Sequence, residues 1–373
     1  MLQLPLPAEI TALDATATSE RVRRVRAELA ERVIILGHHY QRDEIVRWAD
    51  YTGDSLKLSQ LAAAHPEAPW IVFCGVHFMA ETADILTTPE QTVILPNLNA
   101  GCSMADMAAA GQVEACWQTL GNWLDADGIV PVTYVNSTAA IKAFVGRHGG
   151  ACCTSSNARQ VLEWALGRGD RVLFLPDQHL GRNTAVDLGL NPEGEMAVWA
   201  PSLPDGGLTA ADAQRARILL WKGHCSVHAR FTVEQIEQAR LTKPGCRVIV
   251  HPECLLAVVR AAGESGSTER IIDAVASSAP GTTWAIGTEI NLVRRLAQQH
   301  PDKEIFCLDP VVCPCSTMYR IHPHYLLWVL EELAAQRVVN PIRVAPLVAA
   351  DARVALQRML SLSRPLPELA LSR

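Results

Sequence analysis

Three cysteines end three similar stretches of this chain: Cys102, Cys225 and Cys315. The first stretch begins at His38, which follows an apolar run, and the third begins at His251, which follows another. The step from His38 to Ser55 equals the step from His251 to Thr268. The longer step from His38 to Cys102 likewise equals the step from His251 to Cys315. Two equal spacings in the same order predict an internal repeat.

The middle stretch is a longer copy of this pattern. Tyr134 follows an apolar run, and the steps from it to Ser155 and to Cys225 are both longer than their counterparts in the other copies. The segment 189–215, rich in Pro, Gly and Ala, is the expected insertion that lengthens this copy. Three equivalent units can bring their cysteines to one axis, which would make a three-thiolate site with one open position. Such an arrangement is typical of a catalytic rather than a structural metal site.

The spacing of these cysteines bears on the metal that they would hold. The sequence has no Cys-x-x-Cys pair, which disfavours a zinc ribbon. Three thiolates suit a [4Fe–4S] cluster with one iron left open. The open iron would be a Lewis acid that takes a substrate hydroxyl or carboxylate and helps it leave as water. A zinc ion with three sulfur ligands and one water is the competing possibility.

Polar side chains stand where the apolar runs stop, at 37–40 (GHHY), 133–136 (TYVN) and 251–253 (HPE). Parallel sheets bind ligands at the carboxyl ends of their strands, so these groups are expected to line a pocket. Each copy also has a hydroxyl residue in a turn that opens a predicted helix: Ser55, Ser155 and Thr268. Such residues are preferred N-caps, and three helix N-termini at one axis would also bind a polyanionic small molecule.

Short β-rich runs alternate with amphipathic helical stretches along most of the chain. The expected strands are 33–36, 70–74, 92–95, 129–135, 171–175, 247–250, 283–286 and 305–308. The expected helices include 19–32, 138–145, 157–168, 232–240 and 290–299. This alternation predicts parallel sheets covered by helices on both faces. We therefore expect an α/β fold of three pseudo-threefold-related small parallel-sheet α/β/α subdomains around a central active site.

The repeat divides the chain into three expected domains. The first α/β repeat would span 1–118, and the second would span 119–229 with its insertion at 189–215. The third would span 230–373 and include C-terminal helices that pack on the outside.

A polar elbow follows the second strand of each copy, at residues 74–80, 175–181 and 286–292. A third predicted strand then leads to the cysteine of each copy.

The composition narrows the classes of protein. At 373 residues the chain suits two or three subdomains. Hydrophobic residues make up 49% and charged residues 19%, as in a soluble globular protein. A net charge of −6 does not favour binding to nucleic acid. The sequence has no run of 18 apolar residues, so no membrane span is predicted. The N-terminus lacks the basic region of a signal peptide, so we expect a cytoplasmic location.

The chain has eleven cysteines, and an odd number without a signal peptide argues against a disulfide framework. Cysteine is often a small buried hydrophobic residue. Six are expected to have only that role because they lie in apolar runs: Cys74, Cys116, Cys152, Cys153, Cys246 and Cys307.

A specific set of segments contains the residues discussed so far: GHHYQ at 37–41, GDSLKLS at 53–59, YVNSTA at 134–139, TSSNA at 154–158, HCSVH at 224–228, VHPEC at 250–254 and CPCSTM at 313–318. Together they resemble the quinolinate synthases, the NadA-type enzymes of NAD biosynthesis, over residues 33–336. The resemblance implies a triangle of three α/β domains around a [4Fe–4S] cluster, in agreement with the repeat.

The resemblance also implies a reaction. Iminoaspartate would condense with dihydroxyacetone phosphate to give quinolinate, phosphate and two waters. L-Aspartate oxidase is then a possible supplier of iminoaspartate. No nucleic acid or membrane partner is expected.

Residue roles follow from the same resemblance. The implied cluster ligands are Cys102, Cys225 and Cys315. The implied pocket residues are His38, Tyr40, Ser55, Tyr134, Asn136, Ser155, His228, His251, Glu253 and Thr268. Enolisation and imine formation need an acid–base group, which Glu253 and His251 can offer, with His38 and Tyr40 as further catalytic candidates.

Two cysteines near the predicted site are open to more than one interpretation. Cys313 and Cys315 lie close together, but the repeated spacing from His251 and the Cys-x-x-Met pattern that ends at Met318 favour Cys315 as the ligand. Cys313 would then be a neighbour, and a Cys-x-Cys disulfide would be geometrically strained. For Cys254 the sequence does not distinguish packing from function.

Two other kinds of protein fit part of this pattern. A zinc-dependent hydrolase or lyase could use the same three thiolates, and metal analysis separates it from a cluster enzyme. An iron–sulfur redox sensor would need no polar pocket beside the cluster. It would leave Glu253, Asn136 and Tyr134 without a role, and the sequence has no basic helix for binding DNA.

Overall fold

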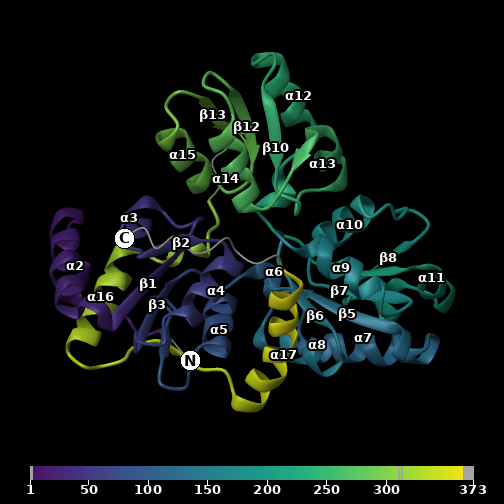
Figure 1. Cartoon of the computed structure of the whole chain (residues 1–373), viewed down its shortest axis with the longest axis horizontal. Coiled ribbons are helices and arrows are strands. Elements are labelled where there is room, and N and C mark those ends of the chain that lie inside the picture. The colour runs from purple at the N-terminus through teal and green to yellow at the C-terminus, as the bar shows by residue number, and fades with distance from the viewer. Residues whose placement is uncertain (1–2, 310, 312–313, 364–373) are drawn as a thin grey trace.

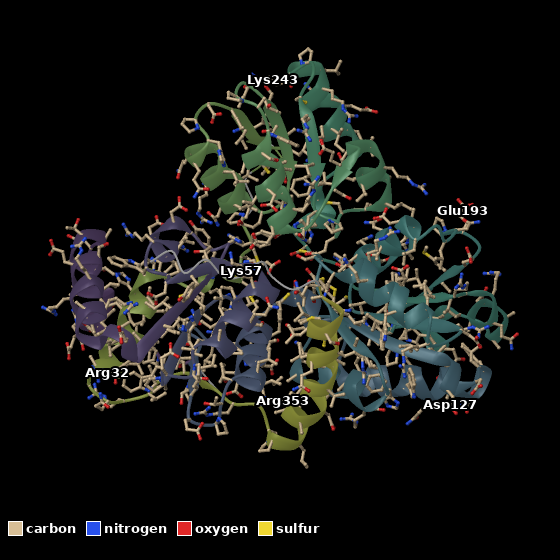
Figure 2. All side chains as sticks on the ribbon, in the orientation of Figure 1. Arg32, Lys57, Asp127, Glu193, Lys243 and Arg353 are labelled. Carbon is tan, nitrogen blue, oxygen red and sulfur yellow. The ribbon has the colours of Figure 1, made fainter. Side chains whose placement is uncertain are left out.

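Three α/β lobes surround a common centre in this computed structural model, which describes residues 3–309, 311 and 314–363 (Figure 1). Each lobe is built on one sheet, and the lobes are numbered here in the order of their first strands. Several charged residues, Arg32, Asp127, Glu193 and Lys243, lie on the outer rim of the lobes (Figure 2).

The first lobe contains a five-stranded sheet in the order β14-β4-β3-β1-β2. Its strands are β1 (Val33–His38), β2 (Tyr51–Gly53), β3 (Trp70–Cys74), β4 (Thr92–Ile94) and the late β14 (Pro341–Ile342). Its helices are α1 (Ala8–Thr11), α2 (Ala15–Leu29), α3 (Asp43–Val46), α4 (Ser55–Ala64), α5 (His77–Leu86) and the short α6 (Ser103–Asp106).

The second lobe contains a five-stranded sheet in the order β6-β5-β7-β9-β8. Its strands are β5 (Ile129–Tyr134), β6 (Ala151–Cys153), β7 (Arg171–Leu175), β8 (Met196–Trp199) and β9 (Ile218–Trp221). Its helices are α7 (Ala110–Trp123), α8 (Ala139–Arg147), α9 (Ala158–Leu166), α10 (Gln178–Asp187) and α11 (Ala210–Arg215).

The third lobe contains a four-stranded sheet in the order β11-β10-β12-β13. Its strands are β10 (Arg247–Val250), β11 (Glu264–Ser265), β12 (Thr283–Gly287) and β13 (Glu304–Cys307). Its helices are α12 (Val233–Thr242), α13 (Leu256–Ala262), α14 (Thr268–Ser277) and α15 (Ile290–Gln299).

The three sheets share one topology once β8, which lies in the segment 189–215, and the antiparallel β14 are set aside. In each lobe the first strand lies between the second and the third, the fourth pairs with the third, and all of these pairs are parallel. Parallel pairing places the carboxyl ends of all these strands at one edge of each sheet. The prediction of three related parallel-sheet α/β/α units is therefore confirmed.

Burial explains why these segments form parallel strands. Every residue of β1 and of β5 is buried, as expected for strands covered by helices on both faces. The helices show the complementary pattern, because α15 buries Ile290, Leu292, Val293 and Leu296 on one face. The predicted helix at 19–32 begins earlier, at Ala15, where Asp14 accepts a 2.8 Å hydrogen bond from the Ala17 N–H and caps the helix.

The C-terminal elements return to the first two lobes. Helix α16 (Pro323–Ala334) packs on α2, and β14 pairs antiparallel with β4. Helix α17 (Pro346–Leu362) packs on α8 and also contacts α5 of the first lobe (Figure 1). Gly146 of α8 permits a close approach, since a Cβ there would lie 2.0 Å from the Asp351 carbonyl oxygen. The domain boundaries at 118/119 and 229/230 stay a prediction.

The apolar core is continuous in two lobes and divided in the third. One buried cluster runs through the first and second lobes, whereas the third lobe has two smaller clusters of its own. Of the six cysteines expected to be buried side chains, Cys307 alone is only half-buried. Within the described residues no helix is long and apolar enough to cross a membrane.

Candidate active site

One pocket lies where the three lobes meet, at the carboxyl ends of their parallel strands. The space inside it that protein atoms do not fill, including solvent at its mouth, is about 660 Å³. All the residues predicted for the site line this pocket: His38, Tyr40, Ser55, Cys102, Tyr134, Asn136, Ser155, Cys225, His228, His251, Glu253, Thr268 and Cys315. The structure places all of these residues in one pocket, and their chemical roles stay predictions.

Two pocket histidines have the same local geometry: His38 ends β1, and His251 directly follows β10. His38 Nδ1 accepts a 3.1 Å hydrogen bond from the Tyr40 N–H, and His251 Nδ1 accepts one of 3.4 Å from the Glu253 N–H. Burial lowers the pKa of each imidazole to about 3, so both rings are neutral at pH 7. Because Nδ1 accepts, the proton of each neutral ring is assigned to Nε2, which is left to donate to a ligand.

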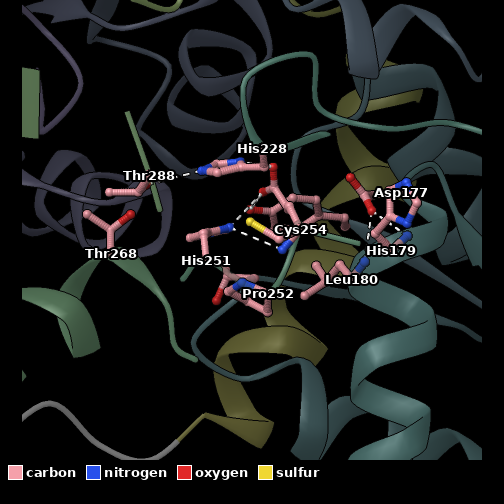
Figure 3. A network of polar contacts seen from close by, with 12 residues as sticks. Asp177, His179, Leu180, His228, His251, Pro252, Cys254, Thr268 and Thr288 are labelled. Carbon is pink, nitrogen blue, oxygen red and sulfur yellow. Dashed lines mark hydrogen bonds and ion pairs between the residues drawn. The ribbon is translucent and has the colours of Figure 1, made fainter. Parts of the chain in front are cut away.

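Glu253 is the centre of a buried polar network, and Figure 3 labels its neighbours His228 and His251. Its Oε1 accepts a 2.7 Å hydrogen bond from the Tyr134 hydroxyl, and its Oε2 lies 2.8 Å from His228 Nδ1. His228 Nε2 lies 3.1 Å from the Thr288 hydroxyl, and the His228 and His251 rings stack with centroids 4.3 Å apart. A carboxylate held in this way has a fixed orientation in the pocket.

The ionisation of Glu253 follows from competing effects. Burial alone would raise the pKa of this carboxyl, but His251, His228 and the hydrogen bonds from His228 and Tyr134 lower it, and the net direction is down. Burial raises the pKa of both Tyr40 and Tyr134 well above the usual range. Near neutral pH the pocket therefore offers one carboxylate as a proton acceptor and two phenol groups as donors.

Thr288 contacts two residues that line the pocket, and it was not singled out from the sequence. Its hydroxyl lies 3.0 Å from the Tyr40 hydroxyl and 3.1 Å from His228 Nε2, so it links the first lobe to the Glu253 network. The Tyr40 hydroxyl also lies 3.2 Å from the Thr268 hydroxyl. The polar elbow at 286–292 was the available signal for Thr288.

The hydroxyl residues at the helix starts are not the helix caps. Ser55 and Thr268 are the first residues of α4 and α14, and the caps are Asp54 and Ser267. Asp54 accepts from the Lys57 N–H at 2.9 Å, and Ser267 accepts from the Arg270 N–H at 3.3 Å. The expectation that Ser55 and Thr268 serve as N-caps is therefore wrong. Their hydroxyl groups remain available to the pocket, where they line the wall.

Ser155 also differs from a cap. It lies between β6 and α9, and α9 begins only at Ala158. The neighbouring Ser156 hydroxyl donates a 3.0 Å hydrogen bond to Asp54 Oδ2 and so joins the second lobe to the first.

Contacts between lobes hold the rim of the pocket. Nε2 of His39 in the first lobe lies 3.0 Å from Oε1 of Glu269 in the third. Arg295 of α15 donates to the carbonyl oxygens of His39 at 2.9 Å and Gln41 at 2.6 Å. The third lobe is therefore tied to the first by polar contacts beside the pocket.

The three predicted ligand cysteines occupy equivalent places. The carbonyl of each accepts a hydrogen bond from the N–H four residues later, at 3.1 Å for Cys102, 3.0 Å for Cys225 and 3.0 Å for Cys315. Each cysteine follows the fourth shared strand of its lobe: β4, β9 or β13. Cys313 lies outside the described residues. The backbone hydrogen bond of Cys315 is the same as those of Cys102 and Cys225, so Cys315 is their counterpart in the third lobe.

The thiols sit in surroundings that disfavour bare thiolates. Burial raises the pKa of Cys102 to about 12, and the neighbouring Cys315 adds to that rise. Burial raises the pKa of Cys225 well above its usual range, with further contributions from Glu253, Cys102 and Cys315. A bound cation would reverse this preference, because metal coordination deprotonates thiols.

Cys254 does not line this pocket. It is fully buried, and its Sγ lies 3.9 Å from the Gly287 carbonyl oxygen in the third lobe. This placement favours packing over chemistry for Cys254.

The fold and the pocket define an α/β enzyme in which three lobes share one site of thiols and acid–base groups. The family model described as Quinolinate synthetase A protein matches residues 20–361. The chain therefore belongs to the quinolinate synthetase A family, whose enzymes act in NAD biosynthesis. Enzymes of this kind act on small molecules, and the family and the cysteines together indicate a metal cofactor.

Curated relatives agree with this assignment. The chain is 58% identical over 359 residues to the quinolinate synthase of Corynebacterium glutamicum, covering 96% of this chain and 91% of the relative. It is 56% identical over 356 residues to that of Anoxybacillus flavithermus, with 95% and 96% covered. It is 56% identical over 345 residues to that of Streptomyces coelicolor, with 92% and 87% covered.

Proposed function

We propose that this chain is a quinolinate synthase that condenses iminoaspartate with dihydroxyacetone phosphate, giving quinolinate, phosphate and two waters. The observation that carries the proposal is the convergence of three cysteines and the Glu253 network on one pocket between three lobes. L-Aspartate oxidase is the proposed source of iminoaspartate. The cytoplasm is the proposed location, because the ten described cysteines are unpaired, as a reducing compartment keeps them.

The proposed cofactor is a [4Fe–4S] cluster held by Cys102, Cys225 and Cys315. Thiolates around one zinc ion lie about 3.8 Å apart, as follows from tetrahedral bonds of about 2.3 Å. The three sulfur atoms, all on described residues, do not all lie within 4.8 Å of one another, so a wider group than one ion suits them. A cluster with one open iron supplies a Lewis acid that polarises a substrate oxygen.

The side chains around the cysteines fit the remaining chemistry. The Glu253 carboxylate is oriented by Tyr134 and His228 and can remove the proton that enolisation requires. Neutral His38 and His251 can donate from Nε2 to substrate carbonyl or carboxylate oxygens. The starts of α4 and α14, with Ser55 and Thr268, provide free N–H groups for phosphate and carboxylate.

A single divalent ion is the alternative occupant, and one observation favours it. The potential ligand atoms of Cys225, His228 and Glu253 all lie within 4.8 Å of one another. A zinc ion on these groups would make the chain a zinc-dependent lyase or hydrolase. In that case His228 and Glu253 would be ligands, and no acid-labile sulfide would be present.

The activity is tested by mass spectrometry of quinolinate formed without oxygen from dihydroxyacetone phosphate and freshly generated iminoaspartate. The proposal predicts quinolinate and phosphate in equal amounts, with none when either substrate is omitted. Glu253→Gln should lower the rate about 100-fold or more, because it keeps the size of the side chain but loses the base. Cluster-loaded protein that forms no quinolinate would overturn the proposal.

A further inference from the structure

Corresponding helices of the three lobes have different kinds of residue at the N-cap position. Strand register pairs Gly37 with Cys74, Thr133 with Leu175, and Val250 with Gly287. The third elbow is therefore shifted by one residue relative to an alignment of the elbows at their first residues. The N-cap positions of α5, α10 and α15 are Val76, Asp177 and Glu289, so Asp177 corresponds to Glu289 and not to Thr288.

Glu289 joins its helix to the loop that carries Cys315. Its carboxyl is fully buried, and Oε2 accepts a 2.8 Å hydrogen bond from the Asn291 N–H at the start of α15. Oε1 accepts from the Asn291 amide at 3.0 Å and from the Cys315 N–H at 3.3 Å. One carboxylate therefore caps the helix and holds the backbone of the cysteine.

Asp177 holds the corresponding cap position in the second lobe. It is fully buried, and its Oδ1 caps α10 by accepting from the N–H groups of His179 at 2.7 Å and Leu180 at 2.8 Å. Its Oδ2 has no hydrogen-bond partner among the described residues, so this carboxyl does not hold the Cys225 N–H as Glu289 holds that of Cys315. The adjacent Gln178 N–H donates to the Gly223 carbonyl at 3.0 Å, two residues before the cysteine.

The first lobe provides an internal comparison. The His77 N–H donates to the Ala100 carbonyl at 2.8 Å, again two residues before the cysteine of the lobe. Val76 at the cap position has no polar side chain, so the Cys102 loop has no carboxyl partner there. A short Ser or Thr would satisfy a helix start as well as an acid does, so capping alone does not require Glu at position 289.

We propose that Glu289 is a positioning residue that sets the backbone of Cys315 so that its thiol is ready to take the cluster. The inference rests on the proposed [4Fe–4S] cofactor. Groups behind metal ligands fix ligand orientation, and their loss typically weakens metal binding about 10- to 100-fold.

The decisive variant is Glu289→Ser, because Ser still caps α15 but is too short to reach the Cys315 N–H. Protein reconstituted with iron and sulfide without oxygen is mixed with a chelator, and the fading of the visible absorbance is timed. We expect Glu289→Ser to lose its cluster about tenfold faster than the unchanged protein. Glu289→Gln keeps one acceptor oxygen for the Cys315 N–H but replaces the other by an amide donor, so it should lose its cluster more slowly than Glu289→Ser.

A matched control exchanges a cap that touches no cysteine. Asp14→Ser replaces the cap of α2 in the same way and should leave the rate of cluster loss unchanged. Thermal unfolding of the cluster-free chains shows whether either exchange changes the stability of the fold. If Glu289→Ser loses its cluster no faster than Asp14→Ser, the positioning role is wrong. If the unchanged protein itself takes up no cluster, the proposed cofactor fails instead.

Discussion

The Tyr134 hydroxyl donates a 2.7 Å hydrogen bond to Oε1 of Glu253 and so joins the second lobe to the third inside the pocket. A carboxylate from one lobe is thereby oriented by a phenol group from another. The reacting groups can have their proper arrangement only when these two lobes are together, because neither lobe holds both partners.

Replacing Tyr134 by Phe should lower the rate at neutral pH. The Tyr134 hydroxyl orients the Glu253 carboxylate, and the variant leaves Oε1 without this partner. A hydrogen bond to a charged group stabilises it by about 1.5–3 kcal/mol, so the rate should fall about 10-fold or more. Tyr51→Phe, on β2 and outside the pocket, is the control. A Tyr134→Phe rate equal to that of the control would show that Tyr134 does not act through Glu253.

His251 should make the fold sensitive to acid. Its pKa is about 3 in the folded chain and about 6.5 when unfolded, so below pH 6.5 the unfolded chain binds a proton that the folded chain does not. Its contribution to stability is thus present above the unfolded pKa and is lost as the pH falls toward 3. At pH 5 the loss is about 2 kcal/mol.

His251→Gln should remove this part of the acid sensitivity. Urea unfolding at pH 7 and pH 5 should show that the difference in unfolding free energy between the two pH values is about 2 kcal/mol smaller in the variant. His38, which is buried in the same way, should give a similar result when changed to Gln. Equal pH differences in the variant and the unchanged chain would contradict the neutral, buried state of His251.

Gly146 should be needed for the contact between α8 and α17. A Cβ at this position would lie 2.0 Å from the Asp351 carbonyl oxygen, so Gly146→Ala must push the helices apart and should reduce stability by about 1–3 kcal/mol. Gly121→Ala in α7 has open space, with no heavy atom nearer than 3.9 Å, and should gain about 0.5–1 kcal/mol from helix propensity. Thermal melts of both variants test the pair, and a Gly146→Ala variant as stable as Gly121→Ala would refute the close packing.

Cysteine replacements should identify the third ligand. Cys315→Ser should abolish the brown colour of the proposed [4Fe–4S] cluster, because Cys315 occupies the place equivalent to Cys102 and Cys225. Cys313→Ser should keep the colour. The reverse pattern would assign the ligand to Cys313.

Much of this architecture could be predicted because the repeat is visible in the sequence as equal spacings and as polar residues at strand ends. The equal spacings from His38 and His251 arise from equal numbers of residues in the strand, crossover and strand that separate corresponding positions. Polar residues at strand ends then gather because all the strands are parallel. These regularities led to most of the pocket residues predicted above, whereas His228 was implied by the resemblance to the quinolinate synthases.

The rest depends on contacts that no local pattern encodes. Nothing near residue 350 indicates that α17 packs on α8, because that contact depends on the absence of a side chain at the distant Gly146. Aligning the third elbow at its first residue hides the correspondence of Asp177 with Glu289. Strand register reveals it, and so do the equal steps from His38 to Val76 and from His251 to Glu289. Thr288 was passed over because its partners, Tyr40 and His228, come from other segments.

The most direct test is iron and acid-labile sulfide analysis, with an absorption spectrum, of protein purified without oxygen. The account predicts about four irons and four sulfides per chain and a broad band at the blue end of the visible spectrum. A colourless protein that holds one zinc ion and no sulfide would contradict it, and would move the site to the single-ion arrangement of Cys225, His228 and Glu253.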